Sequence, residues 1–199
     1  LGHYTDAALT TRELAKMIKE AGLDFANLPD STFDTPFEEA SGAGAIFGAT
    51  GGVMEAALRT AAYKLGGSGA PIEFKEVRGT AGVKEAEYTV GGTTVKVAVA
   101  SGLGNARNVI EQVKSGKKNY TFIEIMACPG GCINGGGQPY VHDEVRNSID
   151  LKAVRAQALY DYDKESKLRT SHETPAVESI YKEFLGSPNS HKAHELLHT

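Results

Sequence analysis

Apolar residues near the start of the chain recur at a helical spacing. The capping box Thr10-x-x-Glu13 comes directly before them, and Gly22 follows them as a stop signal. Their positions fall on one face of a helix: Leu14, Met17, Ile18 and Ala21. The pattern therefore predicts an amphipathic helix that begins after Thr10 and ends before Gly22.

The middle of the chain changes to a period of two, which is typical of strands. Ile72 to Gly79 alternates in this way and predicts a strand. Ala86–Val90, Gly91-Gly92 and Thr93–Ala100 predict a hairpin, because two glycines suit the positive φ angles of a two-residue primed turn.

A helical pattern follows the hairpin and leads into a further strand. Ser101 to Gly116 has helical spacing, and Tyr120 to Met126 is a largely apolar run that predicts a buried strand. A strand, a helix and a strand in succession imply a right-handed crossover and a parallel pair. Ligands of such sheets bind beyond the carboxyl ends of the strands, which is where Cys128 lies.

Further helices are predicted on both sides of this region. Helical patterns end at Leu65, before two glycines, and extend over Ser148–Tyr160 and Pro175–Leu185. The residues of the Ser148–Tyr160 helix that should point inward are Leu151, Val154, Ala158 and Leu159. The charged run Asp161–Thr170 should be exposed. The fold class predicted is α/β, with a mainly parallel sheet flanked by helices.

Composition and charge narrow the classes of function. The 199 residues carry a formal net charge of −4, which gives no electrostatic footprint for nucleic acid. No run approaches the roughly 18 apolar residues of a membrane span. No charged and then apolar leader opens the sequence, so secretion is not indicated and a cytoplasmic location is expected.

Both cysteines of the chain lie in one glycine-rich stretch. Cys128-Pro-Gly-Gly-Cys132 follows the apolar strand and precedes three more glycines. Glycine permits positive φ and close approach of the backbone to a bulky ligand. Thiolates are the preferred ligands of iron–sulfur clusters, zinc and copper(I). A disulfide and a pair of small buried hydrophobes are the alternatives to a metal site.

A second glycine-rich stretch, Ser41 to Arg59, has two interpretations. It matches neither a dinucleotide fingerprint, since no apolar strand precedes it, nor a phosphate-binding loop, since Gly-Lys-Ser/Thr is absent. Small residues before a helix permit tight packing. They also allow backbone N–H groups to point at an anionic ligand of a large cofactor.

The two stretches together resemble a known family. Ser-Gly-Ala-Gly-Ala-Ile-Phe-Gly-Ala-Thr-Gly-Gly-Val-Met-Glu (41–55) is similar to the second signature of the FeFe hydrogenases, and Glu-Ile-Met-Ala-Cys-Pro-Gly-Gly-Cys-Ile-Asn-Gly-Gly-Gly-Gln-Pro (124–139) is similar to the third. The resemblance implies that residues 1–199 form the carboxy-terminal lobe of a two-lobed catalytic domain. Residues 140–199 would be its helical closing segment.

The resemblance also implies a cofactor and site residues. In the family, four cysteines bind a 4Fe-4S cubane, and one of them bridges to a diiron unit that carries CO, cyanide and a dithiolate. Cys128 matches a cubane ligand and Cys132 the bridging cysteine. Met126 and Phe47 match apolar walls of the diiron pocket. The backbone packed around that unit would be Gly42, Ala43, Gly44 and Ala45.

Two other family signatures are absent from this sequence. They are a Thr-Ser-Cys-Cys-Pro segment and a Met-Pro-Cys segment with its lysine, which supply the proton-relay cysteine, two cubane ligands and a cyanide-binding lysine. Reversible proton reduction would therefore need an amino-terminal portion and a ferredoxin or nicotinamide-linked redox partner. Alone, the chain should be inactive, with the cluster absent or incomplete. The alternative function is a non-catalytic iron–sulfur scaffold or sensor.

Overall fold

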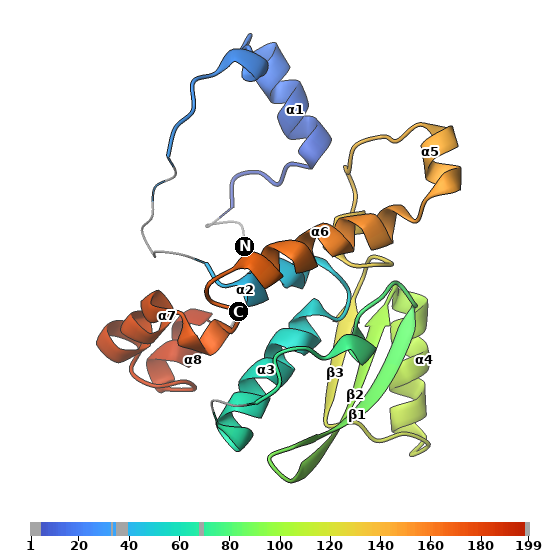
Figure 1. The fold of residues 1–199 in the computed structure, drawn as a ribbon, viewed down its shortest axis with the longest axis vertical. Coiled ribbons are helices and arrows are strands. Elements are labelled where there is room, and N and C mark those ends of the chain that lie inside the picture. The colour runs from blue at the N-terminus through green and yellow to red at the C-terminus, as the bar shows by residue number, and fades with distance from the viewer. Residues whose placement is uncertain (1–4, 33, 35–39, 68–69, 198–199) are drawn as a thin grey trace.

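The fold is centred on a small sheet with a long helix on each face (Figure 1). The computed structural model describes residues 5–32, 34, 40–67 and 70–197. The strands are β1 (Val83–Val90), β2 (Thr93–Ser101) and β3 (Phe122–Met126), in the order β1-β2-β3. The flanking helices are α3 (Gly52–Gly66) and α4 (Leu103–Lys114). The predicted α/β class is thereby confirmed.

The sheet contains one antiparallel and one parallel pair. β1 and β2 form the predicted hairpin, in which Val90 pairs with Thr93. Gly91 and Gly92 have φ angles of 54° and 79°, as a primed two-residue turn requires. β2 and β3 are parallel, with Ser101 opposite Met126, as the intervening helix predicted. Within this chain the sheet is therefore mixed.

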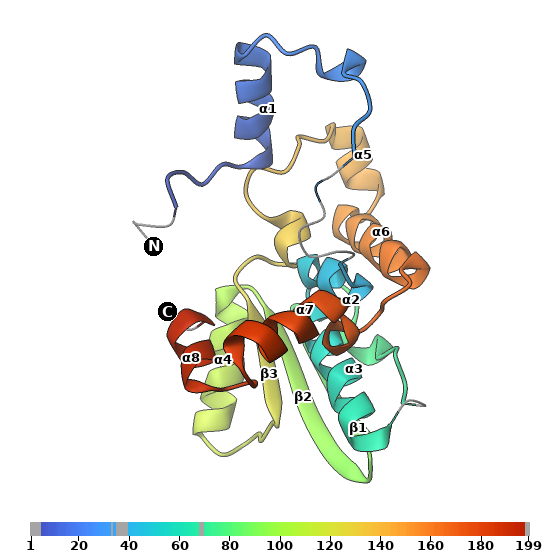
Figure 2. The same cartoon turned by 90° about the vertical axis from the view of Figure 1, so that its left-hand side faces the viewer.

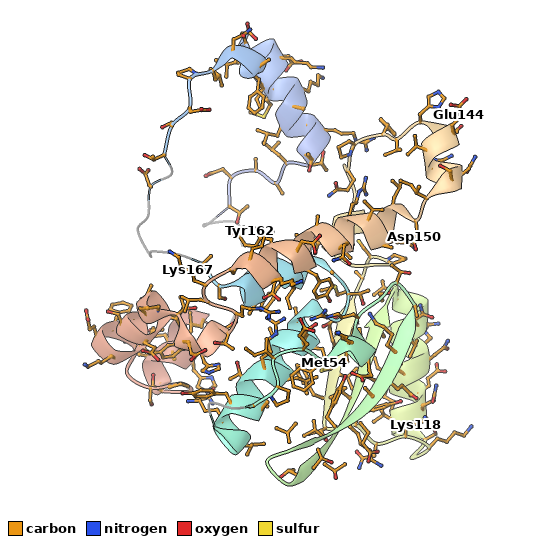
Figure 3. The ribbon with its side chains drawn as sticks, in the orientation of Figure 1. Met54, Lys118, Glu144, Asp150, Tyr162 and Lys167 are labelled. Atoms are coloured by element: carbon orange, nitrogen blue, oxygen red, sulfur yellow. The ribbon has the colours of Figure 1, made fainter. Side chains whose placement is uncertain are left out.

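Alternation along β2 separates two hydrophobic cores. Val97 and Val99 point toward α3 and pack with Met54, Leu58 and Ala62, which are all buried. Figure 3 shows Met54 between α3 and the sheet. The opposite face packs against α4 through four buried residues: Ala98, Ala100, Ala106 and Val109. This sandwich fixes the ends of β2 and β3 near the start of α3.

A helical layer lies next to the amino-terminal end of α3. It consists of the short helices α2 (Gly42–Ala45) and η2 (Ile46–Gly48) and the long helix α6 (Leu151–Glu165). The side chain of Asp150 caps α6 by accepting hydrogen bonds from the N–H groups of Lys152 and Ala153. α6 packs against both α2 and η2 (Figure 2).

The ends of the described chain are helical. α1 (Thr11–Glu20) has the predicted capping box and stands off the sheet, with no buried residue (Figures 1 and 2). Chain segments after residue 140 form helices, and no strand occurs among the described residues there. Besides α6 they are α5 (Asp143–Ser148), η5 (Ser171–Glu173), α7 (Pro175–Ile180), a π-helix (Tyr181–Leu185) and α8 (His191–Leu197).

Three sequence predictions are wrong. The segment from Ile72 to Gly79 forms no strand: it contains one 3-10 turn, η3 (Lys75–Val77), because the buried Phe74 and Val77 pack into the α3 core from an irregular segment. Val154 and Ala158 are exposed, because α6 meets η2 through only part of the predicted face: Leu159 lies against Gly48, and Leu151 and Leu159 are half-buried. The run after Tyr160 is not wholly exposed, because Asp163 is fully buried.

Buried Asp163 belongs to a charge cluster between α3 and α6. Arg59 donates to both Asp163 oxygens at 2.7 and 2.8 Å and to Glu55 at 2.8 Å. Its remaining N–H groups donate to the carbonyls of Ile72 and Arg169, both at 2.7 Å. All five guanidinium N–H groups therefore have acceptors, which is the condition for burying an arginine.

Candidate metal centre

The two cysteines lie in a loop that follows β3 directly. Residues 128–132, named here the cysteine loop, begin two residues after Met126, and Cys132 opens the turn η4 (Cys132–Asn134). Both thiols are free; Cys128 is half-buried and Cys132 is exposed. The disulfide alternative is therefore not adopted here, and neither thiol is sealed in an apolar core.

Positive φ angles give the cysteine loop its path. Gly130 and Gly131 have φ angles of 88° and 96°. A β-carbon on Gly131 would lie 2.7 Å from the Gly48 carbonyl oxygen and 2.7 Å from the Thr50 nitrogen. Both glycines are thus required by the backbone, and the second by contact with another segment.

That other segment is the 48–51 turn, which joins η2 to α3. The Thr50 N–H donates to the Gly130 carbonyl at 3.0 Å. Phe47 precedes the turn and is 43% exposed, so its ring borders open space rather than the core. An apolar groove of about 450 Å³ runs beside it, lined by Phe47, Val53, Ala56, Ala57, Thr60, Ala61 and Ser171.

The small residues before Phe47 are divided between two environments. Gly42 and Ala43 are buried, and a β-carbon on Gly42 would lie 2.5 Å from Asp163 Oδ1. Gly42 is therefore required by packing against α6. Gly44 is exposed and Ala45 is half-buried. The Ser41 side chain caps α2 by accepting from the Gly44 N–H. Contact of these four residues with a cofactor stays a prediction.

Two buried charged residues beneath the 48–51 turn were not predicted from the sequence. Glu124 Oε1 accepts from the Gly51 N–H at 2.6 Å, and Oε2 accepts from the Met54 N–H at 2.7 Å. Lys84 Nζ donates to the carbonyls of Thr50 and Gly79, both at 2.9 Å. The sequence does contain one signal for Glu124: it is a charged residue within an otherwise apolar strand, which indicates a buried carboxylate with specific partners.

The donor set fits half of an iron–sulfur site. Thiolate sulfur is the donor that such clusters use, and the glycine backbone leaves room beside it. However, no group of three or more His, Cys, Asp or Glu side chains placed to bind a metal occurs among the residues that the structure describes. Cys128 and Cys132 therefore supply two ligands, while a cubane needs four.

Lys84 gives the protein a pH dependence with a definite sign. Burial lowers the pKa of Lys84 from 10.5 to about 8, and the Glu124 charge only partly opposes this. Between these values the unfolded chain binds more protons, so stability should rise with pH. Relative to Lys84→Met, the free energy of unfolding should rise by up to about 3 kcal/mol from pH 8 to 10.5.

Urea denaturation at several pH values measures this difference. The control is Lys96→Met, because the Lys96 side chain is 57% exposed and its ion pair with Glu87 lies on the surface. Parallel curves for the parent and Lys84→Met would contradict the burial of a charged Lys84.

Comparison with known proteins connects this geometry to a family. The model of the iron-only hydrogenase large subunit, C-terminal domain, matches residues 2–136, and that of the iron hydrogenase small subunit matches residues 149–199. Iron hydrogenase 1 of Clostridium pasteurianum is 50% identical over 197 residues. That alignment covers 97% of this chain and 34% of the relative, so the chain spans about a third of its length.

Two further similarities bear on structure and on function. A solved FeFe-hydrogenase variant from Chlamydomonas reinhardtii matches with a TM-score of 0.73 and 40% identity, covering 96% of this chain and 54% of that chain. Protein NAR1 of Arabidopsis thaliana is 34% identical over 200 residues, covering 98% of this chain and 41% of that protein.

No helix among the described residues is long and apolar enough to cross a membrane.

Proposed function

Because the chain belongs to the iron-only hydrogenase large-subunit family, we propose that it is the carboxy-terminal lobe of an FeFe hydrogenase catalytic domain. The complete domain would catalyse the reversible reduction of protons to hydrogen. The observation that supports this most directly is the contact between the cysteine loop and the 48–51 turn, made by Thr50 N–H and Gly130 O. It brings both family signatures to one place.

In this proposal the residues of the chain bind and enclose the cofactor. Cys128 and Cys132 would provide two thiolate ligands of a 4Fe-4S cluster, and Cys132 would be the one shared with the diiron unit, as the family resemblance implies. When bound, the group would relay electrons from the redox partner to the protons that are reduced. Met126 and Phe47 exclude water from its surroundings, and the backbone of 42–45 packs around the diiron unit. Excluding water strengthens the electrostatic interactions within such a site.

The other ligands would come from an amino-terminal portion of the catalytic domain. Apolar side chains that such a portion could cover are exposed on this chain: Leu14, Met17, Phe25 and Phe47. Isolated exposed apolar residues are ordinary, but Leu14 and Met17 lie on one helix, α1, that has no buried residue in this chain. Electrons would be exchanged with a ferredoxin or a nicotinamide-linked redox subunit, as the family resemblance implies. A cytoplasmic location stays a prediction from the sequence, because cysteines that bind a cluster form no disulfide in any compartment.

An iron–sulfur scaffold or sensor without catalysis is the second candidate. The cytosolic Fe-S cluster assembly factor narfl of Xenopus tropicalis is 32% identical over 98% of the chain, and this similarity favours the alternative. The higher identity to the Clostridium hydrogenase, 50% against 32%, favours the enzyme.

Hydrogen evolution by the full-length parent after cluster maturation distinguishes the two functions. A hydrogenase should evolve gas with a reduced electron donor, and Cys132→Ser should abolish it while Ser148→Ala, on α5, should not. A scaffold should bind iron and evolve no gas. The 199-residue chain alone should bind iron weakly or not at all, so one stable cubane per chain in iron and sulfide analysis would contradict the half-site.

A further inference from the structure

We propose that Lys84 and Glu124 are positioning residues for the candidate metal centre: they fix the 48–51 turn against the cysteine loop. The role in a metal centre rests on the proposed function, whereas the contacts of the two side chains with the turn do not. Neither residue belongs to the glycine-rich loops: Lys84 is on β1 and Glu124 is on β3.

The sheet places both side chains under the same turn. Lys84 pairs with Val99 on β2, and Val99 pairs in turn with Glu124 on β3. Residues in one row of a sheet point to the same face. Because Val99 packs against α3, Lys84 and Glu124 also face the α3 side, at the level where that helix begins.

The two side chains bind successive parts of one short segment. Lys84 Nζ donates to the Thr50 carbonyl, and Glu124 Oε1 accepts from the next N–H, that of Gly51. The second Glu124 oxygen accepts from Met54 N–H in the first turn of α3, where the helix dipole favours a negative charge. The Thr50–Gly51 peptide is therefore fixed from both sides.

The adjoining peptide, Ala49–Thr50, makes the contact with the cysteine loop. Its N–H group, that of Thr50, donates to the Gly130 carbonyl. The turn also packs closely against the backbone at Val77, because a β-carbon on Gly51 would lie 1.9 Å from the Val77 carbonyl oxygen. A shift of the turn would thus be transmitted to Gly130 and to the two cysteines beside it.

Burying these charges is costly, which argues for a role beyond packing. Lys84 and Glu124 are 8% and 6% exposed. Aliphatic side chains of similar volume commonly stabilise a core as well as buried charges do, but they cannot fix the location of a polar backbone segment. The partners here are backbone groups of the 48–51 turn and its neighbours, so the pair specifies where that turn lies.

The alkylation rate of Cys128 tests the proposal in the chain itself. Lys84→Met and Glu124→Gln should each raise this rate about fivefold under conditions where the protein remains folded, because each loses hydrogen bonds to the turn. Peptide mass spectrometry separates Cys128 from Cys132, whose exposed thiol should react at an unchanged rate. An unchanged Cys128 rate in both folded variants would overturn the proposal.

The chain offers a matched control pair and a measurement that needs no variant. Glu87 and Lys96 face each other on the same sheet and are 59% and 57% exposed, so Glu87→Gln and Lys96→Met should leave the Cys128 rate within about twofold. If the core variants do not fold, hydrogen exchange of the unchanged chain decides. The Thr50 and Gly51 amides should exchange only by near-global unfolding, and rapid exchange would overturn the proposal.

The matured parent separates this proposal from the proposed function. There, Lys84→Met should shift the paramagnetic resonance spectrum and the reduction potential of the iron–sulfur cluster, while Lys96→Met should not. A parent that evolves hydrogen with unchanged spectra in Lys84→Met would refute the positioning role alone. A parent that binds no iron would refute the proposed function, and the alkylation and exchange results would still stand.

Discussion

Replacing Asp163 with alanine should destabilise the chain by about 3–5 kcal/mol, since it removes one of the two carboxylates that neutralise the buried Arg59 and leaves two of its N–H groups without their acceptor. Arg59 would lose two hydrogen bonds of 2.7 and 2.8 Å, and Arg169 would lose one of 2.7 Å. The Arg59 side chain is fully buried, so water cannot replace the lost acceptors without opening the interface between α3 and α6.

Chemical denaturation of the parent and of Asp163→Ala measures this loss. Asp161→Ala is the matched control, because Asp161 is an exposed residue of α6 whose acceptor role is a bond to Gln157 in the same helix. It should cost less than about 0.5 kcal/mol. Equal stability of the two variants would show that the buried cluster contributes nothing.

The pH dependence of the Asp163 contribution has a fixed sign. Burial raises the pKa of Asp163, but the hydrogen bonds from Arg59 and Arg169 outweigh this and leave the pKa below its ordinary value of 3.8. A carboxyl with a lowered pKa stabilises the fold above its ordinary pKa and loses that contribution as the pH falls through the lowered value. The difference between the parent and Asp163→Ala should therefore shrink in acid below pH 3.8.

Local signals predicted the local structure. The capping box at Thr10 and the glycine pair at 91–92 form as expected, because their hydrogen bonds and φ angles depend on residues within a few positions. Asp163 shows the limit of such signals. Its donor Arg59 lies 104 residues earlier in the chain. A charged segment whose carboxylate accepts from so distant a donor has the same local pattern as a solvated one.

The candidate cofactor residues could be predicted from the sequence, but the residues that position their loops could not. Cys128, Cys132 and Phe47 lie in contiguous motifs that can be recognised in the sequence alone. Lys84 and Glu124 are separated by forty positions and meet only because both pair with Val99 through the sheet register. Register depends on the assembled sheet, which no short pattern along the chain encodes.

Gly131→Ala should separate the cysteine loop from the 48–51 turn while most of the fold persists. Its φ angle of 96° is unfavourable for alanine, and the added β-carbon would lie 2.7 Å from two backbone atoms of the neighbouring turn. Strain at such an angle costs about 1–3 kcal/mol, and overpacking against rigid backbone costs about as much again. Moving the loop relieves both, so Cys128 should become more accessible.

Gly136→Ala is the control for Gly131→Ala within the same glycine-rich stretch. No atom lies within 4 Å of a β-carbon at Gly136, and its φ angle is not positive. In the matured parent, Gly131→Ala should lose most of its cluster iron, while Gly136→Ala should retain it. A full iron content in Gly131→Ala would mean that the thiols need no fixed relation to the 48–51 turn. The two signatures would then be neighbours in the fold without forming one metal site.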